Sequence, residues 1–91
     1  MTSRTADVMI VNKRGLHARA AAKFVGVARG FEAQLRVTRD GECADGRSIM
    51  DLLMLGAGPG ISLTLTAEGA DAPALVGALK ALVESGFDEG E

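Results

Sequence analysis

A tight turn between two segments of strand-like composition constrains the fold of this chain more than any other feature. Asp40-Gly41 is a dipeptide typical of two-residue β-hairpin turns, because both central positions of such a turn need a positive φ. In the segment 31–38 before it, apolar and polar residues alternate, as in a strand with one buried and one solvent-exposed face. The short segment 42–44 returns from the turn. This pattern predicts a β-hairpin and therefore an antiparallel sheet.

Two more segments have the composition of strands. The first, 8–11, is a short apolar run with β-branched residues that ends at a polar loop, 12–15. The second, 61–67, alternates apolar residues with serine and threonine and predicts the most regular strand of the chain. With the hairpin, these segments give a sheet of four strands.

Two helices are expected between these strands. From 17 to 28, apolar residues recur every three or four positions, and we expect Gly30 to end this helix in a left-handed conformation. A short helix is expected over 47–55, where Gly56 can stop it.

The last helix has its own start and stop signals. Asp71 can cap its first turn, Pro73 lies where a missing N–H costs little, and Gly86 can end the helix. Its apolar face consists of leucine and valine, namely Leu75, Val76, Leu79, Leu82 and Val83. The order β-α-β-β-α-β-α predicts an α+β open-faced sandwich, in which a four-stranded antiparallel sheet carries three helices packed on one face.

The length of 91 residues suits one domain, 1–91, with an ordered body from about 7 to 85 and a short, acidic, frayed tail at 87–91. No run approaches the roughly 18 apolar residues of a membrane span, and the first residues lack the apolar core of a signal peptide. We expect a cytoplasmic protein with no membrane insertion, and a monomer.

The charge distribution restricts the class of partner. The net charge is −2, yet four basic residues lie in and around the first predicted helix: Arg14, Arg19, Lys23 and Arg29. Binding to the phosphate backbone of a nucleic acid needs a concentrated basic patch, so a net charge of −2 argues against a nucleic-acid partner. A small anionic ligand or an acidic protein fits better.

Single residues limit the chemistry further. Cys43 is the only cysteine, so it forms no intrachain disulfide, and as a small residue it suits a buried or edge-strand position. With one histidine and one cysteine the sequence offers no metal-ligand set, and it shows no nucleotide-binding loop or acid–base pair. We therefore expect no cofactor, no metal and no enzyme activity.

The single histidine, His17, follows a Gly-Leu turn and opens the alanine-rich first helix. At the N-cap it would lie beside the backbone N–H groups of Ala18 and Arg19, which with the helix dipole form an anion site. That field favours a neutral, nucleophilic imidazole, and the Arg19 guanidinium suits phosphate oxygens. The pattern favours a phosphoryl acceptor, although a lone histidine is more often a surface or capping residue and Arg19 more often a solvated charge.

A second group of residues begins at Ser48, which opens the short helix. Its ordinary role is that of an N-cap, and a phosphate there is electrostatically favourable, which makes the serine a candidate for phosphorylation. The helix is too apolar to bury every side chain. We therefore expect Ile49, Met50 and Leu53 to be exposed and to form a protein-docking surface.

Several of these motifs together resemble one family. The run 15–25 is similar to the active-site signature of HPr, the histidine phosphocarrier of the bacterial phosphoenolpyruvate-dependent phosphotransferase system. The segment 46–50 resembles the regulatory serine segment of that family, and 55–57 and 67–69 match in place and spacing. The resemblance extends from about Asp7 to Val83.

The resemblance implies a role for each group of residues. His17 would accept the phosphoryl group on its δ1 nitrogen from phosphorylated enzyme I and pass it to a IIA-type protein, with Arg19 and the backbone of Ala18 stabilising the phosphate. Ser48 would be the target of an HPr kinase/phosphorylase, in lineages that have one, and its phosphate would hinder acceptance at His17. Docking would involve both helices, through Ala18, Ala22, Arg47, Ile49, Met50 and Leu53.

Two positions depart from the family pattern. Ala20 replaces a proline common after the arginine, and because alanine is a good helix former, function should survive with a looser entry into the helix. Arg47 stands where lysine is frequent, which keeps the charge and changes the hydrogen-bond geometry. The alanine variant resembles the nitrogen-related branch of the family.

Two alternative functions stay open. One is a regulatory interaction module of the same fold that acts through Ser48, and the other is an α+β ligand-binding domain unrelated to phosphate.

Overall fold

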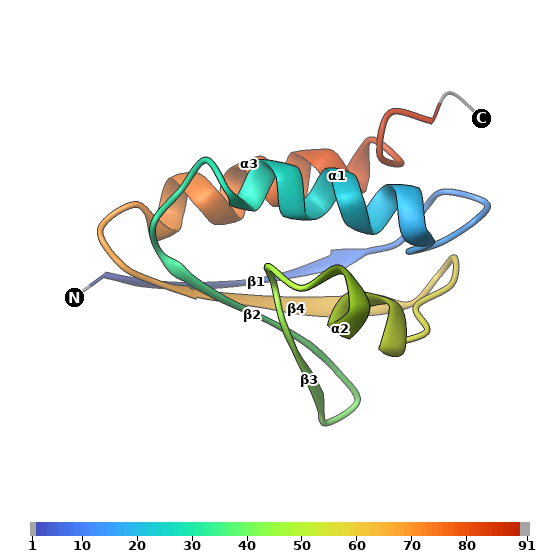
Figure 1. The fold of residues 1–91 in the computed structure, drawn as a ribbon, viewed down its shortest axis with the longest axis horizontal. Coiled ribbons are helices and arrows are strands. Elements are labelled where there is room, and N and C mark those ends of the chain that lie inside the picture. Colours follow the sequence, from blue (N-terminus) through green and yellow to red (C-terminus); the bar gives the residue numbers. More distant parts are fainter. Residues whose placement is uncertain (1, 90–91) are drawn as a thin grey trace.

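The computed structural model describes residues 2–89 and confirms the predicted open-faced sandwich (Figure 1). In chain order its elements are β1 (Ser3–Met9), α1 (Ala18–Ala28), β2 (Gln34–Arg39), β3 (Glu42–Asp45), α2 (Ile49–Met54), β4 (Ser62–Glu68) and α3 (Ala72–Glu84). The helices α1 and α3 lie side by side over one face of the sheet, and α2 packs against α1 and β3. Within residues 2–89, none of the helices has the length and apolar character needed to span a bilayer.

The sheet is antiparallel throughout, with the strand order β1-β4-β2-β3. The inner strand β4 sets the register, because Leu65 pairs with Ala6 of β1 on one side and with Val37 of β2 on the other. The turn between β2 and β3 has φ of 47° at Asp40 and 83° at Gly41, which confirms the predicted hairpin.

The first strand extends further toward the N-terminus than the expected segment 8–11. β1 pairs with β4 from Ser3↔Glu68 to Met9↔Ser62. Its first residues are mostly polar and exposed, so composition gives no sign of them, and only the long-range pairing with β4 makes them a strand. Cys43 lies on β3 at the other edge of the sheet and is exposed there.

The first helix ends without the expected left-handed glycine. Arg29 at the C-cap has a right-handed backbone, and Gly30 has no positive φ, so that prediction is wrong. Instead the last turn tightens, because the Gly30 N–H donates to the Val27 carbonyl and the Phe31 N–H to the Ala28 carbonyl. The carbonyls that a left-handed residue would help to satisfy already have donors.

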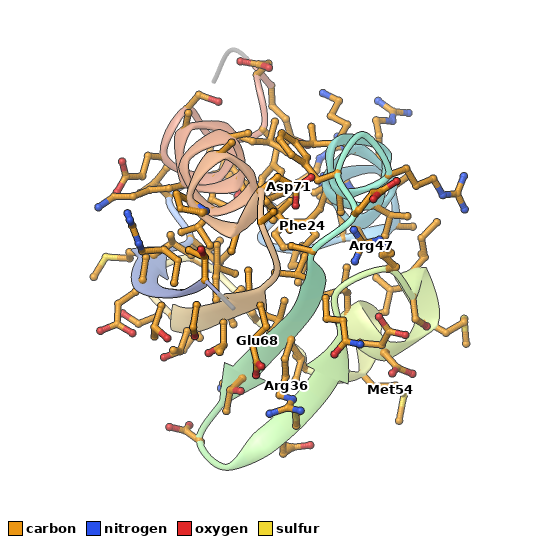
Figure 2. The ribbon with its side chains drawn as sticks, turned by 90° about the vertical axis from the view of Figure 1, so that its left-hand side faces the viewer. Phe24, Arg36, Arg47, Met54, Glu68 and Asp71 are labelled. Carbon is orange, nitrogen blue, oxygen red and sulfur yellow. The ribbon has the colours of Figure 1, made fainter. Side chains whose placement is uncertain are left out.

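The hydrophobic core lies between the sheet and the helix pair. Figure 2 shows Phe24 of α1 between α1, α3 and the sheet, where it is 1% exposed. The inner face of the sheet is buried with it, through Val8, Leu35, Val37, Leu63, Leu65 and Ala67. Burial of each large side chain stabilises the fold by about 1.5–3 kcal/mol. The opposite face carries polar residues such as Arg36 and Glu68 (Figure 2), as the alternation predicts.

Asp71 occupies the N-cap position of α3, but its side chain does not cap the helix, contrary to the prediction. Its backbone, with φ −99° and ψ 16°, lacks the extended shape that a capping side chain needs. The carboxylate instead accepts hydrogen bonds from the backbone N–H groups of Glu32 (2.9 Å) and Ala33 (2.8 Å). Asp71 therefore joins the start of α3 to the connection between α1 and β2.

These contacts predict a pH dependence of folding. The hydrogen bond from Glu32, and then that from Ala33, holds the pKa of Asp71 below its ordinary value of 3.8, against the opposing effect of desolvation. A carboxyl with a lowered folded-state pKa stabilises the protein above its unfolded pKa, and this stabilisation is lost as the pH falls through the folded pKa. Urea unfolding between about pH 5 and about pH 2 should show that wild type loses more stability than Asp71→Asn. Glu42→Gln, in the exposed hairpin, should follow wild type, and wild-type behaviour of Asp71→Asn would contradict the prediction.

The segment after α3 is ordered where a frayed tail was expected. Gly86 ends the helix with φ 71°, as predicted, and Phe87 and Asp88 continue in the left-handed region with φ of 57° and 58°. This turn buries Phe87 completely, and the Glu89 N–H donates to the Gly86 carbonyl. The prediction of a frayed tail is therefore wrong over 87–89, and residues 90 and 91 lie outside the described range.

Candidate functional site

A tight loop carries the chain from β1 to α1 and places His17. Gly15 has φ 66°, and its N–H donates to the Asn12 carbonyl at 3.1 Å. The Leu16 N–H donates to the Ala57 carbonyl at 2.9 Å, which fixes the loop to the segment after α2. A Cβ on Gly15 would lie 2.6 Å from the Ala57 carbonyl oxygen. Only glycine therefore fits this approach of two backbones.

His17 is the N-cap of α1, as the sequence predicts, with an extended backbone (φ −82°, ψ 178°). Its Nδ1 accepts a hydrogen bond from the Arg19 N–H at 3.3 Å. The Nδ1 lone pair therefore faces the first turn of the helix, where backbone N–H groups and the helix dipole favour an anion. The side chain is 22% exposed, so a partner can reach it.

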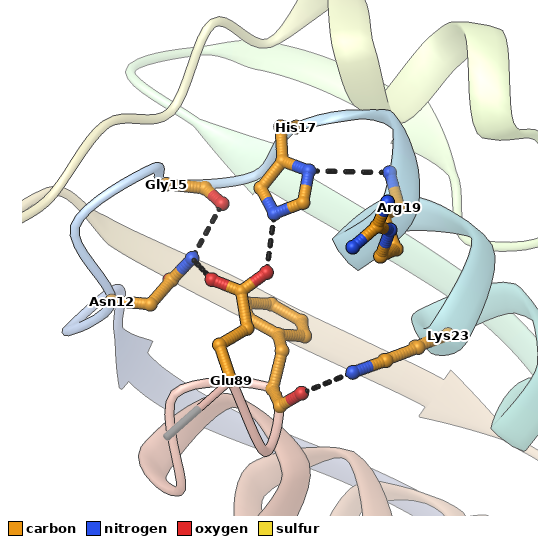
Figure 3. Close-up of polar contacts among 7 residues, drawn as sticks. Asn12, Gly15, His17, Arg19, Lys23 and Glu89 are labelled. Atoms are coloured by element: carbon orange, nitrogen blue, oxygen red, sulfur yellow. Dashed lines mark hydrogen bonds and ion pairs between the residues drawn. The ribbon is translucent and has the colours of Figure 1, made fainter. Parts of the chain in front are cut away.

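The other ring nitrogen of His17 contacts a residue far away in the sequence. Nε2 is hydrogen-bonded to Oε2 of Glu89 (Figure 3). Because Nδ1 accepts a hydrogen bond, Nε2 carries the ring proton of the neutral imidazole and donates it to the carboxylate. The Asn12 side-chain amide donates to Glu89 Oε1 at 2.9 Å and to the Gly15 carbonyl at 2.8 Å. The ring, the loop and the C-terminal segment thus form one network.

Basic side chains gather beside this network. A surface cavity of about 470 Å³ is lined by Lys13, Arg14, Arg19, Lys23, Asp88 and Glu89. Three of the four basic residues expected around the first helix meet here, whereas Arg29 lies at the opposite end of α1. Lys23 Nζ also donates to the Phe87 carbonyl at 2.7 Å (Figure 3). Positive charge next to the ring suits the binding of a phosphoryl group.

Sequence reasoning does not single out Asn12 or Glu89 as site residues. Glu89 falls in the presumed tail, and Asn12 in a loop whose polar residues simply end a strand. The one local signal is Phe87, a large apolar residue directly after the glycine that ends α3. Its burial brings Glu89 back over the loop.

Ser48 is the N-cap of α2, and its Oγ accepts a hydrogen bond from the Asp51 N–H at 3.1 Å, which confirms the capping role. The residue is half-buried. Two carboxylates belong to the same turn, because Asp45 Oδ1 accepts from the Arg47 N–H at 2.9 Å and Asp51 Oδ2 accepts from the Asp45 N–H at 3.2 Å. A phosphate added to Ser48 would meet these two like charges.

The apolar side chains of α2 divide differently from the prediction. Ile49 and Met50 are exposed, at 36% and 68%, whereas Leu53 is half-buried against the core. Met54 is exposed in its place, at 76%, and points away from the molecule in Figure 2. A six-residue helix that buries Leu52 also turns the neighbouring Leu53 partly inward, so the expectation that Leu53 is exposed is wrong.

Of the remaining residues expected at a docking surface, two are exposed and one is not available for docking. Ala18 and Ala22 are exposed on α1, the helix against which α2 packs. The Arg47 guanidinium turns inward and donates to the carbonyls of Ala28 (3.0 Å) and Phe31 (2.7 Å). Arg47 therefore holds the end of α1 in place.

The chain is similar to known phosphocarrier proteins over nearly its whole length. Residues 4–85 match the family model described as the PTS HPr component phosphorylation site. The phosphocarrier protein HPr of Pseudomonas aeruginosa is 52% identical over 86 residues, 93% of this chain and 96% of that protein. The phosphocarrier protein NPr of Shewanella violacea is 43% identical over 89 residues, 98% of each chain. The crystal structure of HPr-C-His from Thermoanaerobacter tengcongensis superposes with a TM-score of 0.92 at 40% identity, over 97% of this chain and 99% of that one.

These matches extend over nearly the whole chain and include both HPr and NPr relatives. They agree with the four-stranded antiparallel sheet and its three helices. Proteins of this kind carry a phosphoryl group between partners and are not themselves enzymes. The chain belongs to the HPr family of phosphocarrier proteins of the phosphotransferase system.

Proposed function

We propose that this phosphocarrier, acting in the cytoplasm, accepts a phosphoryl group from phosphorylated enzyme I on Nδ1 of His17 and passes it to a IIA-type protein. The observation that carries this proposal is the direction of the Nδ1 lone pair, which faces the Arg19 N–H at the first turn of α1. In the transfer, this lone pair attacks phosphorus while the bond between phosphorus and the donor breaks, and that electron pair leaves with the donor.

The surroundings of Nδ1 fit the charge of the transferred group. Phosphoryl oxygens on Nδ1 would lie at the backbone N–H groups of Ala18 and Arg19, at the positive end of the helix dipole. The Arg19 guanidinium adds a donor of fork geometry from the cavity beside the ring. The bond to nitrogen remains reactive, so the group can move on to the next protein.

Labelling with enzyme I and phosphoenolpyruvate tests this function. The expected product is a singly phosphorylated protein whose label is stable in base and lost in acid, as for phosphohistidine. Addition of a IIA-type protein should then discharge it. A chain that stays unlabelled, or that carries an acid-stable phosphate ester after this treatment, would overturn the proposal.

Docking of these partners is assigned to the exposed side chains beside the site, which are Ala18 and Ala22 of α1 with Ile49, Met50 and Met54 of α2. Met50→Asp is expected to raise the KM of enzyme I for this protein about tenfold, because a charge would lose its water in the interface. The kcat should stay near that of wild type, because the substitution is on α2 and leaves the hydrogen bonds of the His17 ring to Arg19 and Glu89 in place. Met9→Asp, at a residue 50% exposed on β1, is the matched control. Equal KM values for the two variants would contradict this docking surface.

Ser48 is proposed as a regulatory phosphorylation site on the same chain. A phosphate on Ser48 would add negative charge next to Asp45 and Asp51 and beside the proposed docking residues Ile49 and Met50. We expect Ser48 phosphorylation to slow acceptance at His17 by at least about tenfold, which corresponds to roughly 1.4 kcal/mol of lost complementarity.

An HPr kinase/phosphorylase with ATP provides the measurement for Ser48. Its label should be absent from Ser48→Ala, and the phosphorylated wild-type protein should react slowly with enzyme I. An unchanged rate would contradict the regulatory role. The alternative, a regulatory module in which His17 is unused, predicts that the kinase labels Ser48 while enzyme I labels nothing.

A further inference from the structure

The carboxylate on His17 Nε2 is built into the molecule by several independent contacts. The Glu89 side chain is 12% exposed, well below the exposure of an ordinary surface ion pair. One of its oxygens contacts His17 and the other accepts from Asn12, whose own side chain is 4% exposed and held by the Gly15 carbonyl. Both oxygens therefore have fixed places in the network (Figure 3).

The backbone that carries Glu89 is also shaped for this contact. Three consecutive residues, Gly86, Phe87 and Asp88, have left-handed φ values of 71°, 57° and 58°. Residues other than glycine adopt this conformation only at a cost in energy, so the surrounding contacts must hold it. They do, because Phe87 is fully buried and its carbonyl accepts from Lys23 Nζ at 2.7 Å. The turn directs Glu89 back onto the histidine.

The two nitrogens of the ring face different environments. Nδ1 faces the first turn of α1 through the Arg19 N–H, and Nε2 faces the carboxylate. Glu89 therefore does not occupy the place of a phosphoryl group on Nδ1. The surface cavity that Glu89 lines is also lined by Lys13, Arg14 and Arg19. Their positive charge offsets the repulsion between the carboxylate and an incoming anion.

We propose that Glu89 is a positioning residue for phosphoryl transfer: it fixes the His17 ring with the proton on Nε2 and stabilises the positive charge that the ring gains in the reaction. This inference rests on the proposed function of His17. When the Nδ1 lone pair forms the bond to phosphorus and the donor leaves with its electron pair, the ring keeps its Nε2 proton and becomes cationic. A carboxylate bonded to that proton favours this change, in either direction of transfer.

The single histidine makes a direct measurement simple, because every imidazole signal of the chain comes from His17. In wild type, at a pH where the ring is neutral, NMR of ¹⁵N-labelled protein should show an Nε2-bound proton that is shifted downfield and protected from exchange with water. Glu89→Ala should lose this signal. Glu89→Gln, whose amide oxygen can still accept, should keep a weaker and less shifted signal. An Nε2 proton signal in Glu89→Ala identical to that of wild type would overturn the proposal.

The kinetic arm uses enzyme I with the full-length variants. Glu89→Ala is expected to lower kcat for phosphorylation about tenfold with little change in KM, and Glu89→Gln should be intermediate. Glu84→Ala is the matched control, because this carboxylate at the end of α3 is exposed and does not line the cavity, so the variant should leave kcat and KM unchanged. Thermal unfolding of each variant checks that the fold is kept. Equal kcat for Glu89→Ala and wild type would overturn the role of Glu89 alone, whereas failure of wild type and variants alike to accept phosphate would overturn the function of His17.

Discussion

A His17→Ala chain is expected to accept no phosphoryl group from enzyme I under conditions that label wild type completely. The reason is that the proposed acceptor atom is Nδ1 of His17, which lies at the first turn of α1. Quantitative phosphorylation by mass spectrometry is the measurement. Full labelling of His17→Ala would falsify the assignment of the acceptor.

Loss of the N-cap is a separate effect of this substitution and needs its own control. Because Nδ1 also accepts the hydrogen bond of the Arg19 N–H, alanine removes a cap worth about 1 kcal/mol. His17→Asn keeps an oxygen that can accept this hydrogen bond but has no nucleophilic ring nitrogen. It should therefore restore most of the lost stability and remain unlabelled. Ser48→Ala, which alters the other candidate phosphorylation site, should be labelled by enzyme I as fully as wild type.

Gly15→Ala is expected to lower the free energy of unfolding by about 3 kcal/mol and to reduce phosphoryl acceptance as well. A side chain there meets two penalties. The backbone has φ 66°, and the added Cβ would lie 2.6 Å from the Ala57 carbonyl oxygen and 2.8 Å from Gly58 Cα. Both neighbours are backbone atoms, so relief requires the loop before His17 to move.

Gly41→Ala separates these two penalties. Gly41 also has a positive φ, 83°, but a Cβ there would meet open space. It should therefore lose only the conformational part, about 1 kcal/mol, and keep normal phosphorylation. Urea unfolding compares the two variants, and equal losses of stability would show that the contact with the 57–58 backbone is not tight.

The parts of the fold that local chemistry determines were predictable from the sequence. The Asp40-Gly41 turn and the alternation in β4 are such cases, because turn conformation and strand faces depend on residues adjacent in the chain. The polar half of β1 was not predictable in this way, since it is a strand only through its pairing with β4. The same holds for Asp71, whose carboxylate finds donors at Glu32 and Ala33 in a connection remote in sequence.

Some residues of the candidate site were likewise predictable from local sequence, and others were not. His17, Arg19 and Ser48 are each recognisable from their place at a helix start, and the structure puts His17 and Ser48 at N-caps. Glu89 lies 72 residues from His17, and no pattern of local residues connects them. The acidic composition of the last residues favours a solvated tail. The structure instead buries the aromatic side chain of Phe87, which holds residues 87–89 against the rest of the molecule.

The left-handed turn at 86–88 has a practical consequence for handling the protein. The turn sets where Glu89 lies, so an insertion or a cleavage within 86–88 would separate the carboxylate from the His17 ring although it changes no residue of α1. A spectroscopic label is better placed on Ser3, which begins β1 at the end of the strand opposite the loop that leads to His17. Preparations used for assays of phosphoryl transfer should therefore be checked by mass spectrometry for an intact segment 86–89.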